Sequence, residues 1–181
     1  MSARIEPAAA PYSPEIAAAL ERLTPPGTSP LVLFTTIARD QRLFNKLMSA
    51  GLLDRGNLTL REREIVILRT TARCGSAYEW GVHVAFFSAK AKLEPDAVRA
   101  TVLDGPDAPC WSPDERALIA FCDALHETCT VDDARYADVA ATHTPEAILE
   151  ILMLAGYYRT ISYLTNALRL PLEAIAAPMP Q

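Results

Sequence analysis

The sequence of 181 residues predicts an all-α fold in a single domain. Apolar residues recur three and four positions apart, as in Leu31, Phe34, Ile37 and Ala38, and the alternation typical of strands is nearly absent. Pairs of a hydroxyl residue and a proline, which suit the first position of a helix, recur along the chain. Because half of the residues are hydrophobic, a chain of this length can bury one substantial core.

Caps and breaks predict the helices in order. Four hydroxyl-proline pairs mark helix starts: Ser13-Pro14, Ser29-Pro30, Ser112-Pro113 and Thr144-Pro145. Capping boxes, the last with Asp in the usual Glu place, are predicted at Thr59 to Glu62, Ser112 to Glu115 and Thr130 to Asp133. The resulting helices cover residues 14–23, 30–50, 60–73, 76–92, 95–103, 113–128, 131–142 and 145–169.

The two ends of the chain differ from the segment between them. Residues 1–12 and 171–181 are rich in Pro and Ala, so we expect a flexible N-terminal arm and a C-terminal tail around a helical domain at 13–170. The last helix, 145–169, is apolar over much of its circumference. Such a helix is predicted to be central or to lie at a subunit interface.

Composition limits the partners and the compartment. The formal charge is −5, and acidic and basic residues are mixed along the chain, so no basic stripe is available for nucleic acid. No apolar run reaches the roughly 18 residues of a membrane span, and the N-terminus lacks the pattern of a signal peptide. We therefore expect a cytoplasmic protein that acts on a small molecule and binds neither nucleic acid nor membrane.

The four cysteines show no C-x-x-C spacing and no regular framework; they are Cys74, Cys110, Cys122 and Cys129. This pattern fits free thiols in a reducing compartment better than a disulfide scaffold. Cys122 and Cys129 are too far apart for a disulfide within an intact helix.

Proton-transferring groups concentrate near the middle of the chain. Glu79 and His83 lie four residues apart, so on a helix they point from one face. Glu64 stands in the apolar run Glu64–Leu68, where burial would raise its pKa and make it a proton donor or acceptor. A Glu/His pair at this spacing is often only a solvated surface pair, but the aromatic residues around it favour a buried, functional one.

Several other residues are candidates for lesser roles. Arg39, Arg42 and Arg69 suit a substrate carboxylate, although surface or ion-pair roles are the alternative. His126 and His143 are interpreted as structural. Tyr157, Tyr158 and Asn166 are candidates to line the same cavity as the proton-transferring residues, with core packing as the alternative for the tyrosines.

The central segment resembles a known family. Residues 58–69, Leu-Thr-Leu-Arg-Glu-Arg-Glu-Ile-Val-Ile-Leu-Arg, and 74–83, Cys-Gly-Ser-Ala-Tyr-Glu-Trp-Gly-Val-His, are similar to the carboxymuconolactone decarboxylase-like proteins of the alkylhydroperoxidase D-like superfamily. The resemblance implies an alkylhydroperoxidase D-like helical fold, with a site between the helices that bear Glu64 and His83. It also implies a homo-oligomer, as a dimer, trimer or hexamer.

The resemblance departs from the redox branch of that superfamily at two positions. There, a glutamate stands twelve residues before a Cys-x-x-Cys-x-x-x-His motif. Here Glu64 stands twelve residues before Ser76, and Ser76 and Glu79 occupy the two cysteine positions. Because peroxide reduction in this superfamily needs an attacking thiolate and a resolving thiol, the dithiol peroxidase chemistry is disfavoured.

These observations predict a decarboxylase-like enzyme with cofactor-free acid/base chemistry. We expect decarboxylation or proton transfer on a small carboxylated lactone or related acid, with His83 as acid/base and Glu64 and Glu79 as its partners. Substrate contacts are predicted for Ser76, Tyr78, Trp80 and Asn166. Glu64, Glu79 and His83 are acceptable metal ligands, but E-x-x-x-H is a weaker pattern than H-E-x-x-H, and we expect no metal.

Two alternatives remain open at this point. One is a peroxidase or oxidoreductase of the peroxiredoxin type. The other is a helical oligomer or small-ligand-binding protein without catalysis. Convergence of Glu64, Glu79 and His83 around a cavity would favour the enzyme over the last alternative.

Overall fold

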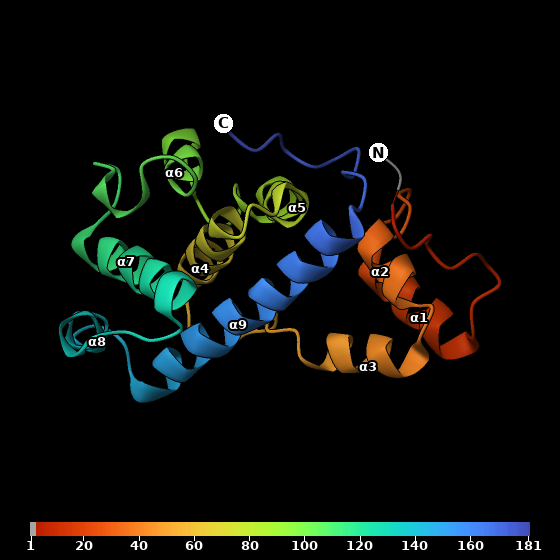
Figure 1. Cartoon of the computed structure of the whole chain (residues 1–181), viewed down its shortest axis with the longest axis horizontal. Coiled ribbons are helices and arrows are strands. Elements are labelled where there is room, and N and C mark those ends of the chain that lie inside the picture. The colour runs from red at the N-terminus through yellow and green to blue at the C-terminus, as the bar shows by residue number, and fades with distance from the viewer. Residues whose placement is uncertain (1–2) are drawn as a thin grey trace.

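The computed structural model describes residues 3–181, and within this range the chain is helical without strands (Figure 1). The elements in order are α1 Pro14–Leu23, α2 Val32–Ile37, α3 Gln41–Ser49, α4 Leu60–Arg73, α5 Ala77–Phe87, α6 Pro95–Ala100, the short 3-10 helix η1 Gly105–Asp107, α7 Pro113–Thr128, α8 Asp133–Ala140 and α9 Pro145–Leu168. The predicted all-α, single-domain class is confirmed.

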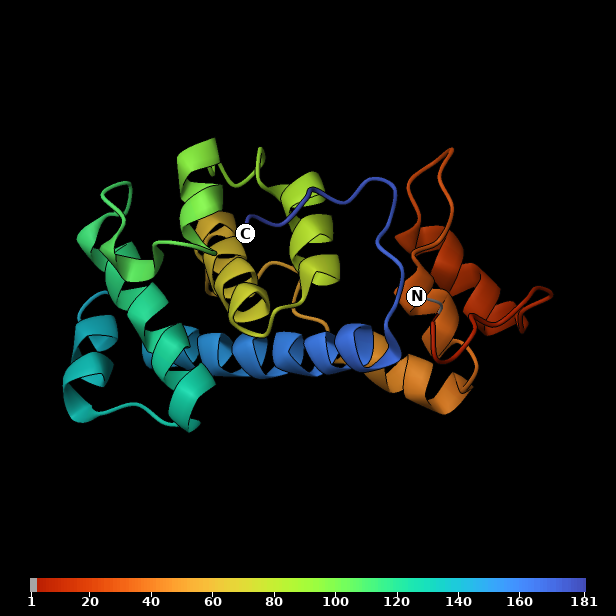
Figure 2. The same cartoon turned by 45° about the horizontal axis from the view of Figure 1, so that its top comes forward.

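Helix α4 is the centre of the molecule. It packs against α5, α7 and α9, and every residue from Arg63 to Thr71 is buried. The long helix α9 runs through the middle of the molecule, with α1–α3 at one of its ends and α7 and α8 at the other (Figures 1 and 2). A helix surrounded on several sides places its charged side chains inside the protein, and α4 carries Glu64 there.

The apolar interior is divided into two clusters. The larger lies around α4, α5, α7 and α9, and includes Ile67, Phe121 and Ile151. The smaller joins α1 to α3 through Ile16, Leu20 and Phe44. Two partly buried side chains, those of Phe34 and Ile37, contact both clusters, so α2 connects the N-terminal helices to the main core.

The local capping signals are confirmed for four helices. The side chains of Ser13, Thr59, Ser112 and Thr144 each accept a hydrogen bond from a backbone N–H in the first turn. The capping boxes of Thr59 with Glu62 and of Ser112 with Glu115 are complete. As a result α1, α4 and α7 have the bounds that the sequence predicts, and α9 is one residue shorter.

The single helix predicted over 30–50 is wrong, because the chain forms α2 and α3 with a break between them. Asp40 is extended, with φ −126° and ψ 105°, and its carboxylate accepts from the Leu43 N–H at 3.0 Å to cap α3. The start predicted at Ser29-Pro30 is also wrong, since α2 begins at Val32. There the Val32 N–H donates to the carboxylate of Glu173 at 2.5 Å, in place of a local cap.

Three further boundaries differ from the prediction. Helix α5 ends at Phe87 rather than at 92, and the turn after it reaches the left-handed region at Lys92, with φ 54°. Helix α6 ends at Ala100. Helix α8 begins at Asp133, and Asp132 caps it by accepting from Arg135 N–H at 2.8 Å, so the box predicted from Thr130 is wrong.

Both ends of the described chain are attached to the helices. The Arg4 N–H donates to the Leu168 carbonyl at 2.8 Å, while the Ala177 N–H donates to the Gly81 carbonyl at 3.0 Å and holds the tail against α5 (Figure 2). A Cβ added to Gly81 would lie 2.4 Å from the Ala177 oxygen, so glycine permits this close approach. The flexibility expected of residues 1–12 stays a prediction, and residues 1 and 2 lie outside the described range.

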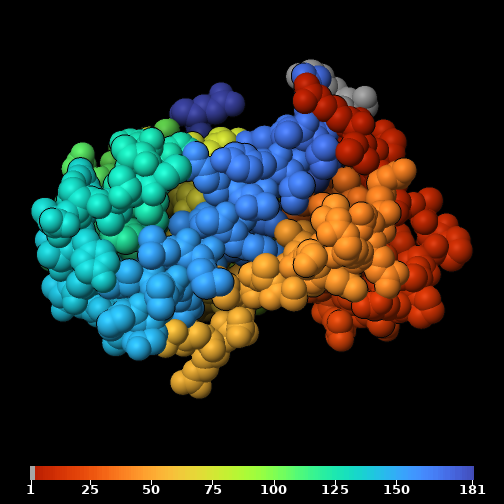
Figure 3. All heavy atoms as spheres, turned by 60° about the horizontal axis from the view of Figure 1, so that its bottom comes forward, coloured from red at the N-terminus to blue at the C-terminus, as the bar shows by residue number. Residues whose placement is uncertain are grey.

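Helix α9 is central on one side and open on the other. Figure 3 shows it crossing one face of the molecule between the N-terminal helices and α7 and α8. Three large side chains of α9 are more than half exposed: Leu149 (61%), Met153 (63%) and Tyr163 (58%). Within residues 3–181, no helix combines the length and the apolar character needed to cross a membrane.

Candidate active site

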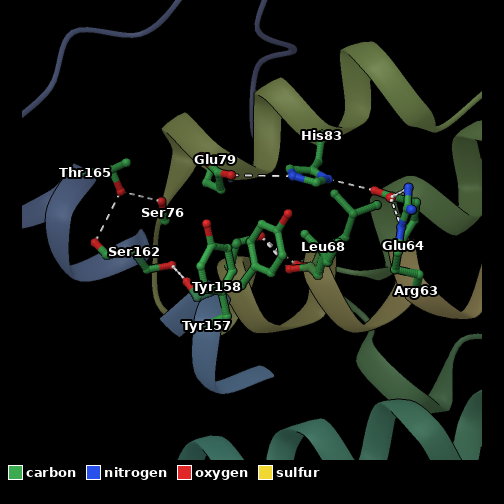
Figure 4. A network of polar contacts seen from close by, with 12 residues as sticks. Arg63, Glu64, Leu68, Ser76, Glu79, His83, Tyr157, Tyr158, Ser162 and Thr165 are labelled. Carbon is green, nitrogen blue, oxygen red and sulfur yellow. Dashed lines mark hydrogen bonds and ion pairs between the residues drawn. The ribbon is translucent and has the colours of Figure 1, made fainter. Parts of the chain in front are cut away.

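The site is built on a buried contact between α4 and α5. The Glu64 side chain is fully buried, His83 is 3% exposed, and His83 Nδ1 lies 2.8 Å from Glu64 Oε2 (Figure 4). Glu64 belongs to the helix that is surrounded by neighbours, and His83 follows one turn after Glu79 on α5. The predicted proximity of Glu64 and His83 is therefore present in the structure.

Arg63 occupies the second oxygen of Glu64. Its Nε and Nη2 lie 3.0 and 2.9 Å from Glu64 Oε1, and its Nη1 donates to the Leu53 carbonyl at 2.8 Å. The guanidinium carbon also lies 5.3 Å from the centre of the Phe87 ring. The cation on one oxygen and His83 on the other hold this buried carboxyl group in a fixed orientation.

The sequence analysis did not assign Arg63 to the site. Adjacent residues on a helix point about 100° apart, so spacing alone argues against this pair. The available signal was the position of an arginine at the start of a strongly apolar run, where a buried cation requires an anionic partner.

Glu79 stands on the other side of the imidazole. Its Oε1 lies 3.5 Å from His83 Nε2, and its side chain is 9% exposed. Its Oε2 is buried and has no hydrogen-bond partner among the described residues. Glu64 and Glu79 thus contact opposite ring nitrogens of His83, and the second carboxylate keeps one oxygen free.

This arrangement keeps His83 protonated at neutral pH. Burial lowers its pKa, but the hydrogen bonds and charges of Glu64 and Glu79 outweigh burial and raise the pKa of His83 to about 9. Both ring nitrogens then carry hydrogen, with Nδ1–H directed to Glu64 and Nε2–H toward Glu79. An imidazolium held in this way can act as a proton donor.

The Nε2 side of His83 faces a cavity of about 540 Å³. Its wall is mainly apolar and comes from the loop after α1, from α2, α3, α5 and α9, with Leu33, Phe34, Met48, Val82 and Phe87 among its side chains. His83, Glu79 and Asp54 bring the ionisable groups to this wall. A mostly apolar cavity with a few polar groups gathered at one place is typical of a small-molecule site.

Two tyrosines of α9 complete the wall opposite Glu79 and His83 (Figure 4). The Tyr158 ring packs edge-on against the His83 ring with centroids 4.9 Å apart, and the Tyr157 hydroxyl donates to the Leu47 carbonyl at 3.1 Å. Burial and the nearby charge of Glu79 raise the pKa of Tyr157 to about 12. Both phenols therefore remain neutral at physiological pH, and both tyrosines line the cavity as the sequence suggested.

The four residues predicted to contact substrate do not line this cavity. Ser76 Oγ lies 2.8 Å from Thr165 Oγ1, and Trp80 Nε1 donates to Thr101 Oγ1 at 3.0 Å. Asn166 is exposed and donates to the Cys74 carbonyl at 2.8 Å. These hydrogen bonds join α5 and the turn before it to neighbouring parts of the chain.

Tyr78 does not line the cavity itself, but its hydroxyl bonds to Leu33, which does. This hydroxyl accepts from the Leu33 N–H at 3.0 Å and donates to the carboxylate of Glu173. Burial and the Glu173 carboxylate raise the pKa of Tyr78, so the phenol stays neutral. Tyr78 thus ties α5 to α2 and to the tail, rather than meeting a ligand directly.

The candidate arginines lie elsewhere. Arg69 is buried against Asp123, with Nε and Nη2 at 2.6 and 2.7 Å from its two oxygens, while Arg42 is exposed and Arg39 donates to the Glu6 carbonyl. None of the three lines the cavity. An arginine for a substrate carboxylate, which the sequence suggested, is therefore missing from this wall.

The described cysteines are all free thiols, as predicted, and none lines the cavity. Cys74 Sγ lies 3.7 Å from His126 Nδ1, and burial raises its pKa. Burial also raises the pKa of Cys122, to about 12. Thiols with raised pKa values hold little thiolate at neutral pH.

Comparison with known families identifies the scaffold. Residues 41–124, which contain both Glu64 and His83, match the carboxymuconolactone decarboxylase family. The expected resemblance to the carboxymuconolactone decarboxylase-like, alkylhydroperoxidase D-like superfamily is confirmed for this segment. No curated protein matches it in sequence.

Several solved structures share the fold of this chain. An uncharacterized peroxidase-related protein from Silicibacter sp. TM1040 superimposes with a TM-score of 0.83 at 15% identity, covering 95% of this chain and 92% of that one. An alkylhydroperoxidase AhpD core protein from Ralstonia eutropha JMP134 gives 0.80 at 17% identity, covering 92% of each chain. A variant of the debrominase Bmp8, in complex with 2,3,4-tribromopyrrole, gives 0.78 at 14% identity, covering 97% and 94%.

This chain has no thiol at the two positions that hold cysteines in the redox motif, which are Ser76 and Glu79. It retains the glutamate and the histidine. The three acid/base residues are arranged in a line rather than around a point. Among residues 3–181, no three His, Cys, Asp or Glu side chains are placed to hold a metal ion.

Proposed function

We propose that the protein is a cofactor-free acid/base enzyme in which His83 transfers a proton to or from a small molecule bound in the cavity. The observation that carries this proposal is the line from Arg63 through Glu64 and His83 to Glu79, buried at its inner end and open to the cavity at its outer end. A solvated Glu/His pair on a helix surface would not need this buried series of charged residues around it.

The roles follow from the geometry. His83 Nε2 is the reactive atom, because Nδ1 is occupied by Glu64 and Nε2 is on the side of Glu79 and the cavity. Glu64 orients the imidazole and raises its pKa, and Arg63 holds the Glu64 carboxyl group in place. Glu79 is the second proton-accepting group, 3.5 Å from Nε2.

Two reaction types use these groups. Loss of carbon dioxide from an activated acid leaves a carbanion that His83 can protonate, and this is the reaction that the family's description suggests. Proton transfer between two atoms of one substrate needs only Glu79 and His83. Proton transfer within one substrate suits this cavity better than decarboxylation, because the cavity lining has no arginine or lysine that would hold a substrate carboxylate.

Dithiol peroxidase activity finds no support in this chain. The motif positions hold Ser76 and Glu79, and a hydroxyl or carboxylate cannot pass through the thiol oxidation cycle. Although two of the similar structures are peroxidase-related proteins, at 15% and 17% identity the likeness concerns the fold. A ligand-binding protein without catalysis would have the cavity but would not require His83 to be held as a cation.

The proposal is tested by proton exchange. A panel of small unsaturated metabolites is incubated in D₂O with the protein, with His83→Ala and with His126→Ala, and deuterium incorporation is followed by NMR and mass spectrometry. We expect incorporation that His83→Ala abolishes and that His126→Ala, a histidine away from the cavity, retains. Equal incorporation by all three proteins would show that His83 is not the acid/base.

We also propose that the protein is a cytoplasmic homo-oligomer. The open face of α9, with Leu149, Met153 and Tyr163 more than half exposed, supports an interface between copies. Light scattering coupled to size-exclusion chromatography, with Met153→Glu as the variant, tests this assembly.

A further inference from the structure

The Oε2 atom of Glu79 lacks a partner at the wall of the cavity. The atom is buried and has no hydrogen bond among residues 3–181, although Glu79 itself lines the cavity. An ionised carboxylate is only an acceptor, with room for about four donors. Here the other oxygen has one contact, His83 Nε2 at 3.5 Å. A buried acceptor left without a donor is costly, so this oxygen indicates a ligand that brings one.

The charges of the cavity wall restrict that ligand further. Glu79 and Asp54 are acidic, and His83 is the basic residue of the lining. The charge of His83 is already shared between Glu64 and Glu79, and Arg63 is directed to Glu64 and to the Leu53 carbonyl. An anionic ligand would therefore be repelled by two carboxylates, with no free cation to compensate. A neutral ligand would not experience this repulsion.

Resting on the proposed function, we propose that the substrate is a small neutral molecule with an apolar skeleton and a hydroxyl group conjugated to a carbon–carbon double bond. Such an enol, dienol or phenol donates its O–H to Glu79 Oε2, and its unsaturated skeleton packs among the apolar side chains. This substrate class replaces the carboxylated lactone or related acid that the sequence suggested, because it excludes a carboxylate.

The same geometry gives a balanced reaction. Glu79 takes the hydroxyl proton, the O–H electron pair forms the C=O bond, and the displaced C=C pair takes the proton from His83 Nε2. One O–H bond breaks and one C–H bond forms, so the net change is a tautomerisation without oxidant or reductant. After the Glu79 carboxyl group rotates to bring this proton beside Nε2, the proton returns to His83 from the position where Oε1 now lies, 3.5 Å from Nε2.

Three probes of one shape test the substrate class: 2-naphthol, 2-methoxynaphthalene and 2-naphthoate. By isothermal titration calorimetry we expect 2-naphthol to bind at least about tenfold more tightly than the methyl ether, which lacks the donor, and than the carboxylate. Glu79→Gln should reduce the preference over the ether to about threefold or less. The exposed Glu127→Gln is the matched control and should leave it unchanged.

Binding and catalysis fail in different ways in this experiment. Equal binding of 2-naphthol and its methyl ether, tighter binding of 2-naphthoate, or an unchanged preference in Glu79→Gln would overturn the substrate class. Exchange of the hydrogen on C1 of 2-naphthol in D₂O, followed by NMR with His83→Ala as the comparison, tests the proton transfer. Selective binding without protein-dependent exchange would overturn the tautomerisation and count against the proposed function, while leaving the donor contact with Glu79 supported.

Discussion

Two of the buried charged residues of helix α4, Glu64 and Arg69, lie five positions apart, and their hydrogen-bond networks end differently. Arg69 donates to both oxygens of Asp123 and, at 3.0 Å, to the Thr101 carbonyl. Glu64 is equally well bonded, but its chain of contacts continues through His83 to Glu79 and ends at an oxygen without a partner among the described residues. The first network is closed, and the second is open at the cavity.

The difference separates structural polarity from functional polarity. A closed network joins elements and fixes their positions, here α4 and α7. An open network retains an unsatisfied group at a destabilising cost of about 1–3 kcal/mol, which a ligand can recover. The open end therefore indicates the site more directly than charge or burial does, since both networks are buried and charged.

The largest expected effect comes from removing the proton donor of the open network. His83→Ala should lower the rate of proton exchange by about 10²- to 10⁴-fold, the range for loss of a general acid/base. The rate is measured by deuterium incorporation under saturating substrate, with circular dichroism as the check on folding. A rate within about threefold of the parent would show that the network ending at Glu79 does not serve proton transfer.

The closed network should instead respond in stability. Arg69→Met leaves the Asp123 carboxylate with only the longer 3.4 Å contact to Arg73, and we expect a loss of about 3 kcal/mol in the free energy of unfolding. Urea denaturation measures it. The double variant Arg69→Met with Asp123→Leu should regain most of the loss, because no unpaired charge remains. A double variant as unstable as the single one would contradict this explanation.

Glu64→Gln should shift the pH dependence of both activity and stability. In the parent the His83 cation persists up to a pKa of about 9, so proton donation should decline as the pH rises through 9. Loss of the Glu64 charge lowers that pKa and moves the decline to lower pH. A pH–rate profile that stays in place would show that Glu64 does not control His83.

The same raised pKa contributes to stability with a defined sign. The folded value of about 9 exceeds the ordinary value of 6.5, so the contribution is complete below pH 6.5 and is lost as the pH rises through 9. Urea denaturation between about pH 6 and 9.5 should show this decline in the parent. Glu64→Gln should show a smaller one.

The smallest effect is expected one helical turn beyond Arg69. Arg73 and Glu127 pair at 2.6 Å across the same two helices, but their side chains are 33% and 58% exposed. Glu127→Gln should cost about 0.5 kcal/mol or less in urea denaturation, because water screens the pair. A cost comparable to that of Arg69→Met would mean that burial is not what separates the two positions.

The fold was predictable where its signals are local. The hydroxyl caps at Ser13, Thr59, Ser112 and Thr144 lie within three residues of the N–H groups that they satisfy, so sequence alone locates four helix starts. The start of α2 at Val32 was not predicted, because the Val32 N–H donates to Glu173, 141 residues away.

The sequence predicted the central residues of the site but not the contacts at its two ends. Spacing placed Glu79 and His83 on one face of a helix, and the family resemblance placed Glu64 beside them. The contacts of Arg63 and the unpartnered oxygen of Glu79 depend on side-chain packing that spacing does not encode. The substrate contact predicted for Trp80 stays a prediction, and its indole N–H donates to Thr101 rather than lining this cavity.

The capping of α2 by Glu173, a residue near the end of the chain, has a consequence for the order in which parts of the protein form during synthesis. Helix α2 supplies Leu33 and Phe34 to the cavity wall, yet Leu31 gives it no side-chain cap, and Glu173 and Tyr78 receive the first N–H groups instead. During synthesis on the ribosome, Glu64, Glu79 and His83 emerge about ninety or more residues before Glu173 does. The reactive residues are therefore translated early, and the wall that encloses them is secured only when the chain is nearly complete.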